Sequence, residues 1–401
     1  MPKRKLYAAA EVLAVALAAA AVWCLKSAVW GLKAPVGDGL VYIAMAAGEE
    51  VAPPWSFHIL TPWLAGLISP RNPVAGFVWV AGLSFVGAAA AVDVLLRRAG
   101  LNLTLGERVL GVALFTATCA GAFMFRGYFL TDSLSYFLLA VACAASLYRR
   151  DWLVALATAV GVLNRETALF VIPVWLLLNA GPRARAPLPW RFAAVFAPAA
   201  VVYLLLHHTP LFLGREPTHF NYLRPDNVAV IWRATRGWLG TENVYYGLAV
   251  CVLLAYGPVW PLAARGMLSV SDEFRRGPLT PVVALWGLAL PVLASLAVVD
   301  WRRGFQPLFP ALVVSAVLGV RVLTERAPRY CWHLLALTTA AAAVATTEAW
   351  ESQPIRRPVI IAAGIWLGVL VFILMVARTG ARPRRADVAA DVAGRHAVDE
   401  G

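Results

Sequence analysis

Apolar runs long enough to cross a membrane follow one another along most of this 401-residue chain. Hydrophobic residues make up 61% of the sequence and charged residues only 14%, whereas a soluble domain carries about 25% charged residues. Backbone polar groups find no water in the hydrocarbon core of a bilayer, so apolar runs that cross it fold as helices. The sequence therefore predicts an all-α polytopic membrane protein.

The apolar runs predict about twelve transmembrane helices, because a span needs about 20 apolar residues. Their expected ranges are 7–30, 74–96, 106–124, 132–148, 152–163, 168–180, 192–214, 246–265, 279–299, 308–323, 331–349 and 359–377. The fifth and sixth are short, which predicts a hairpin that does not fully cross the membrane. The stretch 57–69 is expected to form a short interfacial or re-entrant helix. The polar stretch 378–401 is predicted to be a disordered cytoplasmic tail.

Lysine and arginine residues predict the orientation of the helices. With the N-terminus inside, 22 of the 35 basic residues fall on the inner side, 12 fall on the outer side, and Lys26 lies within the first helix. Cytoplasmic loops carry an excess of such residues, so the count predicts an N-in/C-in, multi-pass protein of the cell membrane. The net charge of +13 then reflects membrane topology, and we expect no nucleic-acid partner.

Ionisable residues gather in four loops that this topology assigns to the outer face. They are Asp38 in the first loop, Arg126 with Asp132, Arg165 with Glu166 at the tip of the short hairpin, and Asp300 with Arg302 and Arg303. A charge at membrane depth costs about 3 kcal/mol on insertion scales, so such residues persist where they pair or catalyse. A single helix-end charge can also reach water along its own side chain. Four loops with the same property favour a shared site.

Carboxylates beside arginines at a membrane boundary suit a lipid-phosphate substrate. A carboxylate can act as general base on an acceptor hydroxyl. Arginines offer fixed, permanently charged forks for phosphate oxygens, and they can stabilise the charge of a leaving phosphate. The sequence holds no Gly-rich nucleotide cradle, so an activated sugar is expected to arrive on a lipid phosphate.

These motifs resemble those of the GT-C superfamily, polytopic glycosyltransferases that use polyprenyl-phosphate-linked sugars. The matching segments are GDGLVY with Asp38 and Tyr42, PPWSFHILTPWLAG, LTDSLSYFLLA, LNRETALFVIPVWLL and DWRRGFQPLFP, spread in order over residues 1–325. The resemblance implies a single catalytic transmembrane domain over 1–377. It also implies an inverting transfer, with a hexose such as mannose expected, to a hydroxyl of a glycan, lipid or protein acceptor.

The resemblance also implies roles for individual residues. Asp38 would be the catalytic base, and Asp132 and Glu166 would position the acceptor or the arginines. The expected substrate-binding residues are Tyr42, His58, Arg126, Arg165, Asp300, Arg302 and Arg303. His58 stands where the resemblance calls for an arginine. Because no second acidic residue accompanies Asp38, we expect no metal, and no cofactor is expected either.

A transporter or lipid flippase is the alternative interpretation. Twelve helices with both termini inside are common among transporters, and charges inside the membrane also mark ion pathways. The C-terminal half, however, holds no second copy of the GDG or NRET segment, and the charges cluster at the outer face. Both features favour the enzyme. An assembly protein without chemistry is a third interpretation, which the depth of Arg165 and Glu166 disfavours.

Overall fold

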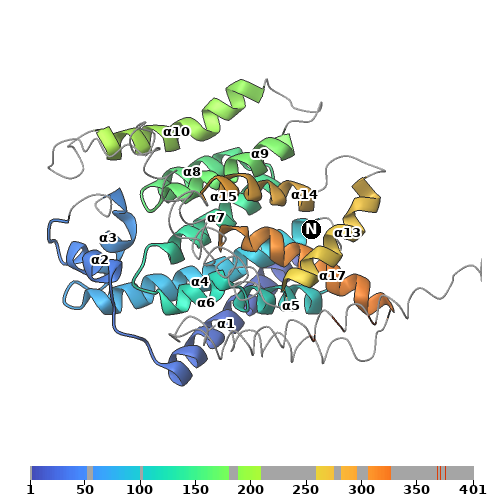
Figure 1. Cartoon of the computed structure of the whole chain (residues 1–401), viewed down its shortest axis with the longest axis horizontal. Coiled ribbons are helices and arrows are strands. Elements are labelled where there is room, and N and C mark those ends of the chain that lie inside the picture. The colour runs from blue at the N-terminus through green and yellow to red at the C-terminus, as the bar shows by residue number, and fades with distance from the viewer. Residues whose placement is uncertain are drawn as a thin grey trace, which may run out of the picture.

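The computed structural model describes residues 2–51, 57–99, 103–179, 188–208, 259–274, 281–295 and 306–326, together with positions 368, 371 and 375. Every regular element within these ranges is an α- or 3-10 helix (Figure 1). The predicted all-α class is therefore confirmed. The expected helix 331–349, the tail 378–401 and most of the expected helix 359–377 lie outside the described residues.

Several helices have the length and composition needed to cross a membrane. Within the described ranges there are four: Ala9–Val29 in α1 (Pro2–Trp30), α4 (Pro73–Arg98), Leu188–Leu206 in α10 (Leu188–His208), and Gln306–Leu323, which joins η5 (Gln306–Leu308) to α17 (Phe309–Arg326). The chain is thus built from apolar helices suited to a membrane. The number of twelve spans and the N-in/C-in topology stay predictions.

The expected helix 106–124 is wrong as a single element. It consists of α5 (Leu105–Thr116) and α6 (Cys119–Arg126), which are bent by 55° relative to each other. Thr118 causes the break: its hydroxyl donates to Phe115 O at 2.6 Å and accepts from Gly121 N at 3.3 Å, so it caps a new helix. If α5 and α6 are counted as one span, the described residues contain five elements that could cross a membrane.

The first loop contains two short helices, α2 (Asp38–Ala46) and α3 (Leu60–Ile68). Helix α3 confirms the short helix expected over 57–69, whereas α2 was not predicted. Glycines allow these helices to pack closely. A Cβ on Gly66 of α3 would overlap Ala46 O of α2, and a Cβ on Gly76 of α4 would overlap Ala65 O of α3. Figure 1 shows α2 and α3 together beside α4. The first loop is therefore packed on the bundle.

The short hairpin and the C-terminal helices complete the described bundle. The elements are α7 (Asp132–Leu147), α8 (Asp151–Val162), η2 (Glu166–Phe170), α9 (Val171–Asn179), α13 (Val259–Phe274), α14 (Pro281–Leu285), η4 (Trp286–Leu288) and α15 (Ala289–Ser295). Helix α7 packs on α4, α10 packs on α8, and α13 packs on α17. At the centre, the ring of Phe115 lies 5.6 Å from Phe85 and 5.2 Å from Phe309. These rings join α4, α5 and α17.

A closed ion network joins α1, α4 and α5 at one end of the bundle. The fully buried Asp93 contacts Arg97 at 2.8 Å and Arg108 at 3.3 Å. Glu11 contacts the same two arginines, at 3.1 Å from Arg97 and 2.6 Å from Arg108. Two carboxylates thus neutralise two guanidinium groups. Buried charges are tolerated when each is paired in this way.

Replacing Asp93 by asparagine should destabilise the protein by about 3–5 kcal/mol, because it leaves the buried Arg108 and the half-buried Arg97 with a single carboxylate. The measurement is thermal unfolding of the purified protein in detergent. Arg71→Gln, which removes one exposed charge, is the control and should leave the Tm unchanged. An unchanged Tm for Asp93→Asn would contradict the structural role of the network.

Candidate functional site

The other end of the bundle gathers the predicted site residues that the structure describes. Helix α2 carries Asp38 and Tyr42 one turn apart. Asp132 opens α7, Arg165 lies between α8 and η2, and Glu166 is the first residue of η2. Asp38 and Arg165 are half-buried and Asp132 is buried. Contacts of Tyr42 with His58, of His58 with Glu166 and of Arg165 with Asp132 join these segments at one end of the bundle. Asp300, Arg302 and Arg303 lie outside the described residues.

Tyr42, His58 and Glu166 form a row. The Tyr42 hydroxyl lies 2.7 Å from His58 Nδ1, and His58 Nε2 lies 3.6 Å from Glu166 Oε2. A carboxylate beside Nε2 favours the imidazole tautomer with its proton on that nitrogen, so Nδ1 accepts from the tyrosine. Both ring nitrogens of His58 thus face protein groups. This favours a positioning role for His58 over the predicted contact with phosphate.

Tyr42 keeps its proton at neutral pH. Burial raises the pKa of Tyr42 to about 12. The positive charge of Arg165 lowers this pKa, and the negative charges of Asp132 and Asp38 raise it. The phenol is therefore a stable donor to His58. The charges of Asp38, Asp132 and Arg165 all affect the pKa of the Tyr42 hydroxyl, so each of them interacts electrostatically with it.

The buried Asp132 forms an ion pair with the half-buried Arg165. Arg165 Nη1 donates to Asp132 Oδ1, and the Tyr136 hydroxyl lies 3.5 Å from the same oxygen while donating to Gln306 Oε1. Burial lowers the pKa of Arg165, but the Asp132 carboxylate outweighs it, so the net pKa lies above the ordinary arginine value. Asp132 also occupies the first turn of α7, where the helix dipole favours a negative charge. Arg165 therefore stays charged and fixed.

Asn164 holds the site together. Its Oδ1 accepts from Thr61 N at 3.2 Å and from Thr61 Oγ1 at 2.5 Å, and its Nδ2 donates to Thr131 O at 2.6 Å and Ser135 Oγ at 2.8 Å. The side chain is fully buried. Leu60 N also donates to Leu163 O at 3.1 Å. The first loop, α7 and the hairpin tip are thereby joined through one amide.

Sequence reasoning missed Asn164, Tyr136 and Gln306. The sequence does contain a signal for Asn164, since this asparagine directly precedes Arg165 in an otherwise apolar hairpin. A polar amide at such a depth needs hydrogen-bond partners. Tyr136 and Gln306 carry no comparable signal, because their contact joins residues 170 positions apart.

Arg126 lies in a second cationic region beside the start of α7. Its guanidinium lies 5.3 Å from the centre of the Phe125 ring, and Lys26 Nζ lies 6.0 Å from the centre of the same ring. Both cations are buried. Ser133 Oγ donates to Met124 O at 3.3 Å, which attaches the end of α6 to the first turn of α7. Arg126 is thus held near the predicted site by α6.

The described residues contain no group of three or more His, Cys, Asp or Glu side chains that could hold a metal ion. Comparison of the chain with protein-family models, with curated proteins and with solved structures gives no match.

Replacing Asn164 by leucine should loosen the first loop, because it removes the acceptor of the buried Thr61 N–H and hydroxyl on α3, at about 1–3 kcal/mol each. Hydrogen–deuterium exchange should become faster in peptides covering 57–69, and the Tm should fall. Asn179→Leu is the matched control: Asn179 is also buried and hydrogen-bonded, to Trp175 O and Arg191, at the other end of the hairpin. Equal exchange of 57–69 in the two variants would contradict the role of Asn164.

Proposed function

We propose that this protein is a membrane glycosyltransferase that moves a sugar from a polyprenyl-phosphate donor to an acceptor hydroxyl on the extracytoplasmic face. The observation that carries the proposal is the Asp132–Arg165 ion pair at one end of a bundle of apolar helices, together with the row from Tyr42 through His58 to Glu166 that joins the helix of Asp38 to the segment of Arg165. We assign Asp38 as the base and Arg165 as the phosphate ligand.

Arg165 is suited to hold the donor phosphate. Its pairing with Asp132 engages Nη1, and 20% of the side-chain surface is exposed. A guanidinium has five N–H donors, so the others can reach phosphate oxygens. Because Asp132 fixes the group in advance, it can stabilise the charge of a leaving phosphate without reorganisation. Asp132 thus acts by orienting Arg165.

Asp38 acts as the general base. It takes the proton of the acceptor hydroxyl while the hydroxyl oxygen bonds to the anomeric carbon of the donor sugar. The bond from this carbon to the phosphate oxygen breaks, and polyprenyl phosphate leaves with the electron pair. Attack opposite the leaving group inverts the anomeric configuration. Asp38 is positioned by Gly37, whose φ of +56° suits glycine, and by the close contact of Gly39 with the Phe129 ring.

Tyr42, His58 and Glu166 position the base relative to the phosphate ligand. Their row connects α2, which carries Asp38, to the hairpin tip, which carries Arg165. A shift of about 1 Å between reacting groups can lower a rate about 10²-fold, so this connection matters for the chemistry. The charged residues of the site lie at or beside helix ends. In a transporter, such charges would be expected near the membrane midplane, so their position favours the enzyme.

Asp38→Asn should lower the release of polyprenyl phosphate by about 10²–10⁴-fold, because the variant cannot accept the hydroxyl proton. The assay supplies the purified protein with a panel of polyprenyl-phosphate hexoses, with and without acceptor, and measures the products by mass spectrometry. Glu49→Gln removes an exposed carboxylate just after α2 and is the matched control. Its rate should equal that of the wild type, and both variants should keep the wild-type Tm.

Full release by Asp38→Asn would refute the assignment of the base. If the wild type releases nothing from any donor but moves polyprenyl phosphates between the leaflets of a liposome, the flippase interpretation replaces the proposal.

A further inference from the structure

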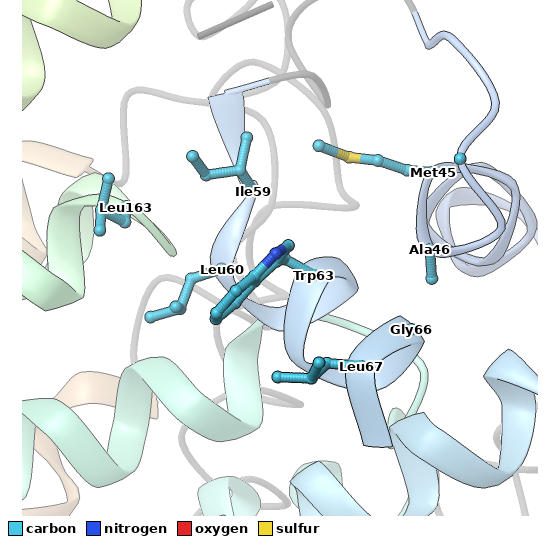
Figure 2. A pocket seen from close by; sticks show the side chains of 9 residues that line it. Met45, Ala46, Ile59, Leu60, Trp63, Gly66, Leu67 and Leu163 are labelled. Carbon is cyan, nitrogen blue, oxygen red and sulfur yellow. The ribbon is translucent and has the colours of Figure 1, made fainter. Parts of the chain in front are cut away.

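The two ends of the described bundle present different surfaces. At the site end, a pocket of about 600 Å³ lies between α2, α3 and Leu163 (Figure 2), and no charged side chain lines it. Helix α7 starts at this end and is 16 residues, or about 24 Å, long. At its far end, the turn to α8 carries Arg149 and Arg150, and α4 ends at Arg98. These three exposed arginines are called the arginine cluster below.

Contacts bring Arg98 to the turn between α7 and α8. Its Nε donates to Leu147 O at 3.4 Å, and its guanidinium lies 5.3 Å from the centre of the Tyr148 ring. The end of α4 therefore lies beside the two residues that precede Arg149. Charged groups from two elements of the bundle thus share one surface.

The arginine cluster carries a positive charge that nearby carboxylates do not balance. In the part of the chain that the structure describes, none of its three arginines forms an ion pair. The nearest carboxylate along the chain, Asp151, is engaged elsewhere. Its Oδ2 accepts from Arg191 at 2.7 Å, and its Oδ1 accepts from Trp175 Nε1 at 3.0 Å. The cluster is therefore complementary to an anion from outside the protein.

Arg149 has a backbone conformation that favours glycine. Its φ is +54°, and among the described residues it is the single non-glycine residue with a positive φ. Arg149 N donates to Ser146 O at 3.0 Å and Arg150 N donates to Ala145 O at 2.9 Å, which is the Schellman pattern at a helix end. Glycine is usual at this position because a Cβ is crowded there. Ending the helix does not require an arginine, so we infer that its side chain has a function.

Exposed aromatic side chains accompany the arginine cluster. Tyr148 is 40% exposed, and Trp152 in the first turn of α8 is 66% exposed. Trp190, which precedes the Arg191 that binds Asp151, is 74% exposed. In a chain built from apolar helices, exposed tyrosine and tryptophan at helix ends favour the level of the lipid headgroups. The arginine cluster is therefore expected to lie at the level of the lipid phosphates.

We propose that the arginine cluster binds the phosphate of an anionic membrane lipid, on the face that the count of basic residues predicts to be cytoplasmic. Guanidinium groups suit phosphate oxygens, because each offers several fixed donors and a permanent charge. The exposed aromatic side chains favour a lipid over a soluble anion or an acidic protein. The proposal does not depend on the proposed function, because the arginine cluster and Arg165 lie at opposite ends of the bundle.

The test titrates the full-length protein in detergent with dioleoylphosphatidylglycerol and measures binding by native mass spectrometry. Dioleoylphosphatidylcholine is the reference, and the wild type should prefer the anionic lipid. Arg149→Gly should weaken the apparent affinity for that lipid about fivefold, as expected for one basic residue near an anionic surface. Its Tm should not fall, because glycine suits the backbone at this position. Adding Arg150→Gln should weaken the affinity by about a further fivefold.

Two further variants separate the charge of Arg149 from its backbone and from net charge. Arg149→Lys keeps the positive charge and the unfavourable backbone, and it should bind phosphatidylglycerol nearly as well as the wild type. Arg71→Gln removes an exposed arginine just before α4, at the site end, and is the matched control. It should bind like the wild type, although it loses the same charge as Arg149→Gly.

Wild-type affinity in the double variant would overturn the proposal, as would equal binding of the two lipids by the wild type. An equal loss in Arg71→Gln and Arg149→Gly would also overturn it, because binding would then follow net charge alone. So would displacement of the lipid by an equal concentration of inorganic phosphate or of an acidic peptide, since the surface would then not select a lipid. A lower Tm with wild-type binding in Arg149→Gly would assign this arginine to structure instead.

Discussion

Hydrocarbon offers no water to a buried polar group, and this constraint organises both ends of the described bundle. At one end, Glu11 and Asp93 neutralise Arg97 and Arg108 in a closed network. At the other end, Asp132 neutralises Arg165, whose side chain is 20% exposed, close to the 18% of Arg97. Pairing and exposure therefore do not distinguish the two ends. The row of Tyr42, His58 and Glu166, which joins the first loop to the segment of Arg165, does distinguish them and makes this end the candidate site.

The site depends on the hydrogen bonds between its segments as much as on its charges. The row from Tyr42 through His58 to Glu166 attaches α2 to the hairpin tip, and Asn164 attaches α3 to the same segment. The first loop and the tip thus form one unit that carries the proposed base and the proposed phosphate ligand.

The sequence predicts the all-α class, because long apolar runs favour helices that satisfy their own backbone groups. It also predicts the short helix of the first loop, found as α3, while the number of spans and their orientation stay predictions. It cannot predict the break at Thr118, because a hydroxyl cap does not alter hydropathy. It also cannot predict the contacts of Asn164, which reach a residue 103 positions away. The position of His58 likewise depends on tertiary contacts that local patterns do not contain.

We propose that a lipid phosphate binds between Asp38 and Arg165 at one end of this bundle. The decisive experiment is a structure determined with a non-hydrolysable polyprenyl-phosphonate sugar. A phosphonate oxygen should lie within hydrogen-bond distance of Arg165, with the anomeric carbon on the side of Asp38. A phosphonate bound away from Arg165, or a sugar separated from Asp38 by other elements of the protein, would contradict it.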